Sequence, residues 1–147
     1  MTPAYSELYL ADASLALGSM LESTVYLFNL ELQTFWRLFL ASHISDDFGN
    51  GLSGTVSGKS GWELAVELLE DARVEFVHVK PTGVVGRSRE FWAGWALAHY
   101  QWQSGLTFRE IEVFAPMKDV LLMYSPYHEM GIDQFCIALD ARRCVSR

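Results

Sequence analysis

The tripeptide Gly58-Lys59-Ser60, within the stretch SGTVSGKSG at residues 53–61, has the residue types that bind phosphate in nucleotide-binding loops. Such a loop needs a glycine, four further residues and then Gly-Lys-Ser or Gly-Lys-Thr, because peptide N–H groups must surround the phosphate. Here Ser53 occupies the place of the first glycine, and polar residues precede the loop where the motif requires a buried strand. The spacing therefore favours a polar turn, with Ser60 capping the next helix, over nucleotide hydrolysis.

An aromatic segment at residues 87–105 is the second stretch whose side chains could bind a ligand. On a helix its rings form two neighbouring stripes, and small residues between them allow another helix to approach closely. Such rings could line a pocket for a flat ligand or form a protein-binding surface, but rings at this spacing more commonly pack in the core. The stripes are Phe91, Trp95, Ala98 and Trp102, and Trp92, Ala96 and His99; the small residues are Ala93, Gly94 and Ala96.

These two stretches together define the candidate ligand-binding residues. A pocket would require the Gly-rich loop 54–60 and the aromatic helix 88–104 to meet around a concave site. The charged residues at the start of the helix could hold an anionic ligand, but they could equally be solvent-exposed charges that cap the helix. The polar groups of this pocket would be Lys59, Ser60, Arg87 and Glu90, and its wall would be Trp92 or Trp95.

The remaining residues that could perform chemistry are histidines and paired acids. None of the four histidines is spaced from another so as to place two metal ligands on one helix face. His43 with Asp46 and Asp47 comes nearest to a metal-binding group, and a solvated loop explains it equally well. The pairs Asp46-Asp47 and Glu110/Glu112 need a cleft before they indicate catalysis. We therefore predict no metal and no cofactor, and leave open both the catalytic residues and whether the protein is an enzyme.

The distribution of charge bears on the partners of the protein. Residues 1–70 contain nine acidic and two basic residues, residues 71–147 contain nine of each, and the net charge is −7. An acidic surface repels the phosphate backbone of nucleic acids. Residues 32–50 loosely resemble a helix-turn-helix, but the second helix would carry Asp46 and Asp47 and no base. We expect no nucleic-acid partner.

The cellular compartment is predicted from cysteines and hydropathy. Cys136 and Cys144 match neither a disulfide framework nor a zinc spacing, which is typical of a reducing compartment. The first twelve residues carry no base, and no apolar stretch approaches the roughly 18 to 20 residues that cross a bilayer. These features favour a cytoplasmic protein without a membrane partner.

The apolar pattern predicts a single mainly α domain over residues 1–147. Half of the residues are hydrophobic and 14% are aromatic, which suits a chain that buries a core. Helical spacing predicts a compact bundle of about seven helices, including a long one at residues 5–30. Ser60, Ser88 and Thr107 are placed to cap the helices that follow them. A cluster of β-branched and aromatic residues followed by turn chemistry predicts a minor β hairpin at residues 74–86.

The segments VSGKSGWELA and REFWAGWALAHYQW resemble those of a family of short, uncharacterised bacterial proteins. These proteins share a Gly-Lys-Ser-Gly turn followed by Glu-Leu-Ala, and a Trp-Ala-Gly-Trp-Ala-Leu-Ala helix. The resemblance runs from residues 38–42 to the final helix and implies no activity, because the family has none established. Members occur among accessory genes, sometimes near toxin–antitoxin-like modules, which favours a protein partner.

Two functions from different classes follow from these observations. The first is a small, non-catalytic cytoplasmic interaction or regulatory protein, which binds a protein partner or associates with itself. The alternative is an enzyme or small-ligand binder that uses the pocket between the loop at 54–60 and the aromatic helix. An interaction protein requires an exposed apolar patch, whereas a ligand binder requires the two segments to share a concave site.

Overall fold

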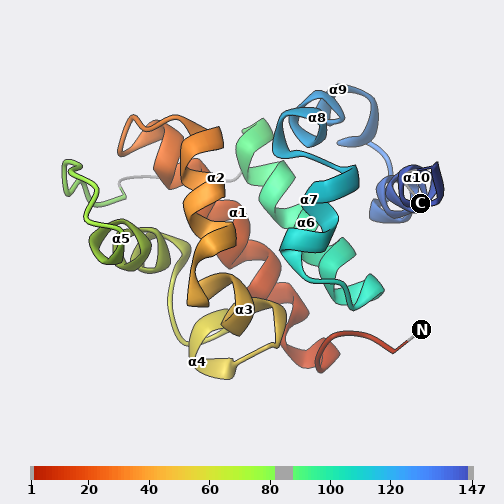
Figure 1. Cartoon of the computed structure of the whole chain (residues 1–147), viewed down its shortest axis with the longest axis horizontal. Coiled ribbons are helices and arrows are strands. Elements are labelled where there is room, and N and C mark those ends of the chain that lie inside the picture. Colours follow the sequence, from red (N-terminus) through yellow and green to blue (C-terminus); the bar gives the residue numbers. More distant parts are fainter. Residues whose placement is uncertain (1, 82–87, 146–147) are drawn as a thin grey trace.

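A computed structural model describes residues 2–81 and 88–145, and every regular element in these ranges is a helix (Figure 1). The mainly α class predicted from the sequence is confirmed. The described residues form ten α-helices where about seven were expected, because short helices split the connections. The elements are the 3-10 helix η1 (Glu7–Tyr9) and the α-helices α1 (Leu10–Tyr26), α2 (Leu32–Ala41), α3 (His43–Gly49), α4 (Ser53–Val56), α5 (Gly61–Asp71), α6 (Arg89–Ser104), α7 (Phe108–Phe114), α8 (Met117–Leu122), α9 (Tyr124–Tyr127) and α10 (Ile132–Val145).

Helix α1 is the centre of the fold and packs between α5 and α6 (Figure 1). Glycines bring these helices into close contact, as expected for the small residues of the aromatic segment. A methyl group at Gly94 of α6 would lie 2.6 Å from the carbonyl oxygen of Leu17, and one at Gly61 of α5 would lie 2.4 Å from that of Ala16. The backbones of α5 and α6 therefore contact different sides of α1.

The predicted helix caps at the start of α5, α6 and α7 are confirmed. Ser60 and Thr107 each form a capping box with the glutamate three residues later, and the Ser88 hydroxyl accepts a hydrogen bond from the amide of Phe91. Helix α6 ends at Gly105, whose φ of 73° lies in the left-handed region that glycine adopts without strain. These local signals explain why α5, α6 and α7 begin directly after the predicted caps.

A cluster of aromatic rings packs α2, α3 and α7 together. The rings of Trp36 and Phe39 stack with centroids 4.8 Å apart, and Phe108 of α7 meets Phe39 edge to face at 5.4 Å. Phe48 of α3 approaches Phe108 at 5.9 Å. Because these rings come from three short helices, the cluster fixes the direction of α3 and the position of His43 at its start.

The predicted β hairpin at 74–86 is not found in the part that the structure describes, residues 74–81; residues 82–86 lie outside the described ranges. In the described part, Val74, Val77 and Val79 follow α5 and form no strand. Phe76 instead packs edge to face on Phe28 at 5.0 Å, and the Trp62 indole N–H donates to the carbonyl of Val79 at 2.7 Å. A side chain thus takes the place that a neighbouring strand would have.

The long helix predicted at 5–30 is shorter in the structure. A 3-10 turn precedes it, and α1 ends at Tyr26. Asn29 has a φ of 53°, a left-handed conformation that stops helical propagation and turns the chain toward α2. Among the described helices, none combines the length and the apolar character needed to cross a membrane.

Candidate functional site

Lys59 and Ser60, two of the predicted ligand-binding residues, line an open groove between the Gly-rich loop and α1. The groove has a volume of about 410 Å³ and also contains Asp12, Leu15 and Ser19 of α1. The Ser57 hydroxyl donates to Asp12 Oδ2 at 2.6 Å, which ties the loop to α1. The loop therefore contributes to a concave surface, with α1 as its other wall.

The predicted pocket residues of α6 lie in other environments. Glu90 is 4% exposed and accepts a hydrogen bond of 2.7 Å from the Tyr26 hydroxyl. Trp92 packs edge to face against Phe135 of α10 at 5.2 Å, and the ring of Trp95 lies 4.4 Å from that of His99. Since α1 lies between α5 and α6, the structure brings Lys59 and Ser60 together and leaves Glu90, Trp92 and Trp95 away from their groove. Arg87 lies outside the described residues.

A buried acid at the α1–α6 contact was missed in the sequence. Glu22 is 5% exposed, and its carboxylate accepts hydrogen bonds from both the hydroxyl and the amide of Ser88. The Tyr26 hydroxyl donates to the other buried acid, Glu90; this hydrogen bond, followed by burial and the charges of Glu90 and Glu22, raises the pKa of the Tyr26 phenol. One feature of the sequence indicates this burial: Glu22 lies one helical turn after Gly18, on the side of α1 that meets α6.

His43 is the centre of a polar group between α3 and α5. Ser42 caps α3, accepting from the amide of Ser45 at 3.4 Å, and so places His43 at the first helical position. Its Nδ1 lies 3.0 Å from Asp47 Oδ2, and its Nε2 lies 3.6 Å from Asp71 Oδ2 of α5. The hydrogen bond to Asp47 raises the pKa of the His43 imidazole.

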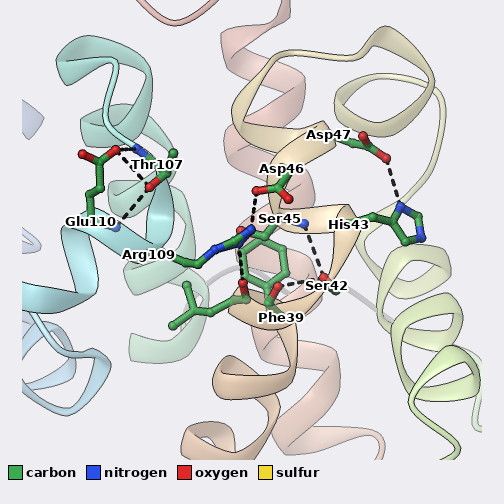
Figure 2. A network of polar contacts seen from close by, with 10 residues as sticks. Phe39, Ser42, His43, Ser45, Asp46, Asp47, Thr107, Arg109 and Glu110 are labelled. Carbon is green, nitrogen blue, oxygen red and sulfur yellow. Dashed lines mark hydrogen bonds and ion pairs between the residues drawn. The ribbon is translucent and has the colours of Figure 1, made fainter.

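Asp46, which the sequence grouped with His43, has a different role. Its carboxylate accepts a hydrogen bond of 2.6 Å from Arg109 of α7, and the same guanidinium donates to the carbonyl of Leu40 at 2.9 Å. Figure 2 shows Arg109 reaching from α7 to the start of α3, while His43 points away from it. Arg109 therefore holds the start of α3 in place from the side opposite α5.

An acidic groove follows the outer face of α5 next to His43. It has a volume of about 320 Å³, and among its described lining residues Lys59 is the one base; its Nζ lies 2.8 Å from Glu67 Oε2. With four carboxylates and one ammonium, the groove favours cations. The acidic residues that line it are Glu63, Glu67, Glu70 and Asp71.

One serine and one histidine meet in the described part of the chain, in a geometry that does not activate the serine. The Ser14 hydroxyl lies 3.1 Å from His99 Nδ1, but it donates its proton to the carbonyl of Leu10 at 2.8 Å. His99 Nδ1 also lies 2.9 Å from the carbonyl oxygen of Trp95, and because a carbonyl oxygen can only accept a hydrogen bond, the nitrogen is the donor. His99 therefore donates at Nδ1 and does not serve as a base for Ser14.

An apolar strip on α10 is the most regular exposed hydrophobic feature of the described chain. Ile137, Ala141 and Val145 recur every four residues, and Ile137 is 60% and Val145 86% exposed. Ala141 and Val145 also line a groove of about 400 Å³ with Phe114. On the opposite face of α10, Phe135, Cys136 and Leu139 are buried in the core. Helix α10 therefore packs on the core with one apolar face and exposes a second apolar strip on the opposite side.

Comparison with known proteins identifies no relative of the chain. No protein-family model matches it, and no curated protein and no solved structure matches it either.

Proposed function

We propose that the protein is a small, non-catalytic interaction protein. Its contact face is the apolar strip of α10, which is formed by Ile137, Ala141 and Val145. Its partner on that face is a second copy of the chain. The observation that carries the proposal is this exposed strip at helical spacing. The free energy of removing such side chains from water favours their burial. Helix α10 lies at the edge of the fold (Figure 1), and the side chains of the strip are exposed, so a partner can reach them.

The size of the residues along the strip supports a second copy as the partner. Ala141 is small and lies between the larger Ile137 and Val145, so two α10 helices can approach closely at their centres. In a two-fold dimer each strip covers the other, which buries both apolar faces with one set of residues. The helix has a firm base for this contact, since the Tyr100 hydroxyl donates to Asp140 at 2.7 Å and Arg142 donates to the carbonyl of Phe114 at 2.9 Å.

The polar sites support a non-catalytic role. Ser14 and His99 do not form a nucleophile and its base, and Glu90, Trp92 and Trp95 do not line the groove of Lys59 and Ser60. The acidic surface disfavours nucleic acid, and the chemistry of the two thiols fits the cytoplasm. The resemblance to a family of uncharacterised bacterial proteins, which favours a protein partner, stays a prediction of the sequence.

The test is the mass of the purified chain across a range of concentrations, measured by light scattering after size exclusion and by native mass spectrometry. We expect a concentration-dependent dimer, weak because one helix strip is small compared with a standard interface. Ile137→Glu should give a monomer at every concentration, since a charge in the middle of an apolar contact is costly to bury. Leu52→Glu is the matched control, because Leu52 is 53% exposed and directly precedes α4, a helix that lies away from α10 in Figure 1.

Two results would contradict the proposal. One is a monomeric wild-type chain at the highest concentration that stays soluble. The other is a dimer that persists in Ile137→Glu and dissociates in Leu52→Glu. A chain that purifies with a bound small molecule of a few hundred daltons would instead favour the ligand-binding alternative.

A further inference from the structure

Potential metal ligands from two helices converge where the start of α3 meets the end of α5. One ligand atom each of His43, Glu67 and Asp71 can be chosen so that all three lie within 4.8 Å of one another. A tetrahedral zinc ion about 2.1 Å from each ligand holds the ligand atoms about 3.4 Å apart. The 3.6 Å between His43 Nε2 and Asp71 Oδ2 is already close to this value, and with all three atoms within 4.8 Å of one another a short inward movement of side chains completes the set.

We propose that His43, Glu67 and Asp71 form a binding site for a divalent transition-metal ion such as Zn²⁺. The site combines one imidazole nitrogen with two carboxylates and leaves the remaining coordination positions to water. Mg²⁺ and Ca²⁺ prefer oxygen ligands alone, whereas an imidazole nitrogen suits zinc and its neighbours in the first transition row. Glu67 and Asp71 are four residues apart on α5, so both carboxylates project from one face of that helix.

The orientation of the His43 ring fits this role. Asp47 is bonded to Nδ1, which fixes the ring so that Nε2 is directed toward Asp71. Figure 2 shows the second ring nitrogen turned away from Asp47, toward the neighbouring helix. A carboxylate on the outer nitrogen of a metal-binding histidine is a common arrangement, because it sets the tautomer and strengthens the nitrogen as a ligand. Since Arg109 holds α3 at Asp46, the histidine has a rigid base.

The surrounding charge also favours a cation at this place. Asp71 is the last residue of α5, where the free backbone carbonyls give the helix end a partial negative charge, and the last turn contains no basic residue. Glu63 and Glu70 line the same groove. Lys59 is the competing cation, but its bond to Glu67 Oε2 leaves the carboxylate a second oxygen for a metal.

The experiment titrates Zn²⁺ into the full chain by isothermal calorimetry near neutral pH. A Cys144→Ser parent is used throughout, because Cys144 is an exposed thiol that could bind zinc by itself. The parent should bind one Zn²⁺ per chain, and His43→Ala and Asp71→Asn should each weaken binding by about tenfold or more. Lys59→Met should bind at least as tightly as the parent, since it removes the competing ammonium.

Matched controls make the same chemical changes elsewhere. His128→Ala removes an imidazole at the end of α9, and Glu31→Gln removes an exposed carboxylate at the start of α2, outside the groove; both should keep the affinity of the parent. Circular dichroism checks that each variant is folded. The proposal is overturned if the parent binds no stoichiometric zinc, if the controls weaken binding as much as His43→Ala and Asp71→Asn, or if Mg²⁺ binds as tightly as Zn²⁺.

Discussion

Gly94 of α6 lies directly against Gly18 of α1: a methyl group at Gly94 would be 2.9 Å from the Cα of Gly18 and 2.6 Å from the carbonyl oxygen of Leu17. These contacts are with backbone atoms, which cannot rotate away as the end of a side chain can. The two glycines therefore set the distance between the central helix and the aromatic helix. The rings of α6 reach their partners on α9 and α10 from this position.

Gly94→Ala should destabilise the protein by about 1 to 3 kcal/mol, the usual cost of overpacking. The sign of this change in stability is informative, because the same substitution in an exposed helix stabilises the protein by about 1 kcal/mol. Gly54→Ala is the control, since Gly54 is also helical and nothing lies within 4 Å of its added methyl group. Urea unfolding measures both. If Gly94→Ala were as stable as Gly54→Ala, the close crossing of α1 and α6 would be wrong.

The Gly-Lys-Ser tripeptide should act as a helix cap. Ser60→Ala removes the acceptor for the Glu63 amide and should cost about 1 kcal/mol of stability, whereas Ser60→Asp should retain most of it because aspartate also caps helices. Lys59→Ala breaks an exposed ion pair and should cost less than Ser60→Ala. Thermal unfolding gives the order of the three variants. A larger loss in Lys59→Ala than in Ser60→Ala would indicate a role for the lysine beyond this surface pair.

The helices with local signals could be predicted from the sequence. Ser60, Ser88 and Thr107 each mark the start of a helix by their own hydrogen bonds, and Gly105 marks an end, so neighbouring residues were sufficient. The hairpin at 74–86 shows the opposite case. The β preference of this segment is real, but a strand needs a partner, and among residues 74–81 the Trp62 indole and Phe28 ring supply the contacts instead.

The candidate sites depend on distances in space that residue spacing does not contain. His43 and Asp71 are far apart in the chain and meet because Arg109 and the aromatic cluster fix α3 beside α5. Glu22 was missed for the same reason, since only the packing of α1 on α6 brings it to Ser88. The sequence predicts that Lys59 and Glu90 can share a pocket, and no local pattern shows that α1 lies between their helices.

Glu112 should make stability depend on pH. Burial raises the pKa of its carboxyl above the ordinary value of 4.5, against hydrogen bonds from the Met117 amide and the Trp36 indole that lower it. A raised carboxyl pKa means that the folded state binds its proton more tightly than the unfolded state, so this contribution is present below about pH 4.5 and is lost as pH rises through the folded pKa. Ionised Glu112 therefore lowers the free energy of unfolding at neutral pH.

Glu112→Gln should remove this pH-dependent cost while its amide oxygen still accepts from Trp36 Nε1 and the Met117 amide. Relative to wild type, the variant should gain stability between about pH 4 and pH 7.5. Urea unfolding at both values measures the gain as a double difference. Glu75→Gln changes the same charge at an exposed site and should show no such gain; an equal gain in both variants would assign the effect to net charge instead.

The two cysteines should differ sharply in reactivity, and the difference reports whether α10 stays docked. Cys136 is buried in the core side of α10, and burial raises the pKa of its thiol to about 12, while Cys144 is exposed. At about pH 8 only about one Cys136 in ten thousand is a thiolate, so a disulfide reagent should label one thiol per native chain quickly and the second only when α10 opens. In Cys144→Ser the fast phase should disappear, and the slow rate that remains should rise with urea as α10 detaches. Two fast thiols in the native wild-type chain would mean that the helix leaves the core readily, and the strip of Ile137, Ala141 and Val145 would then lack the fixed base that a contact face requires.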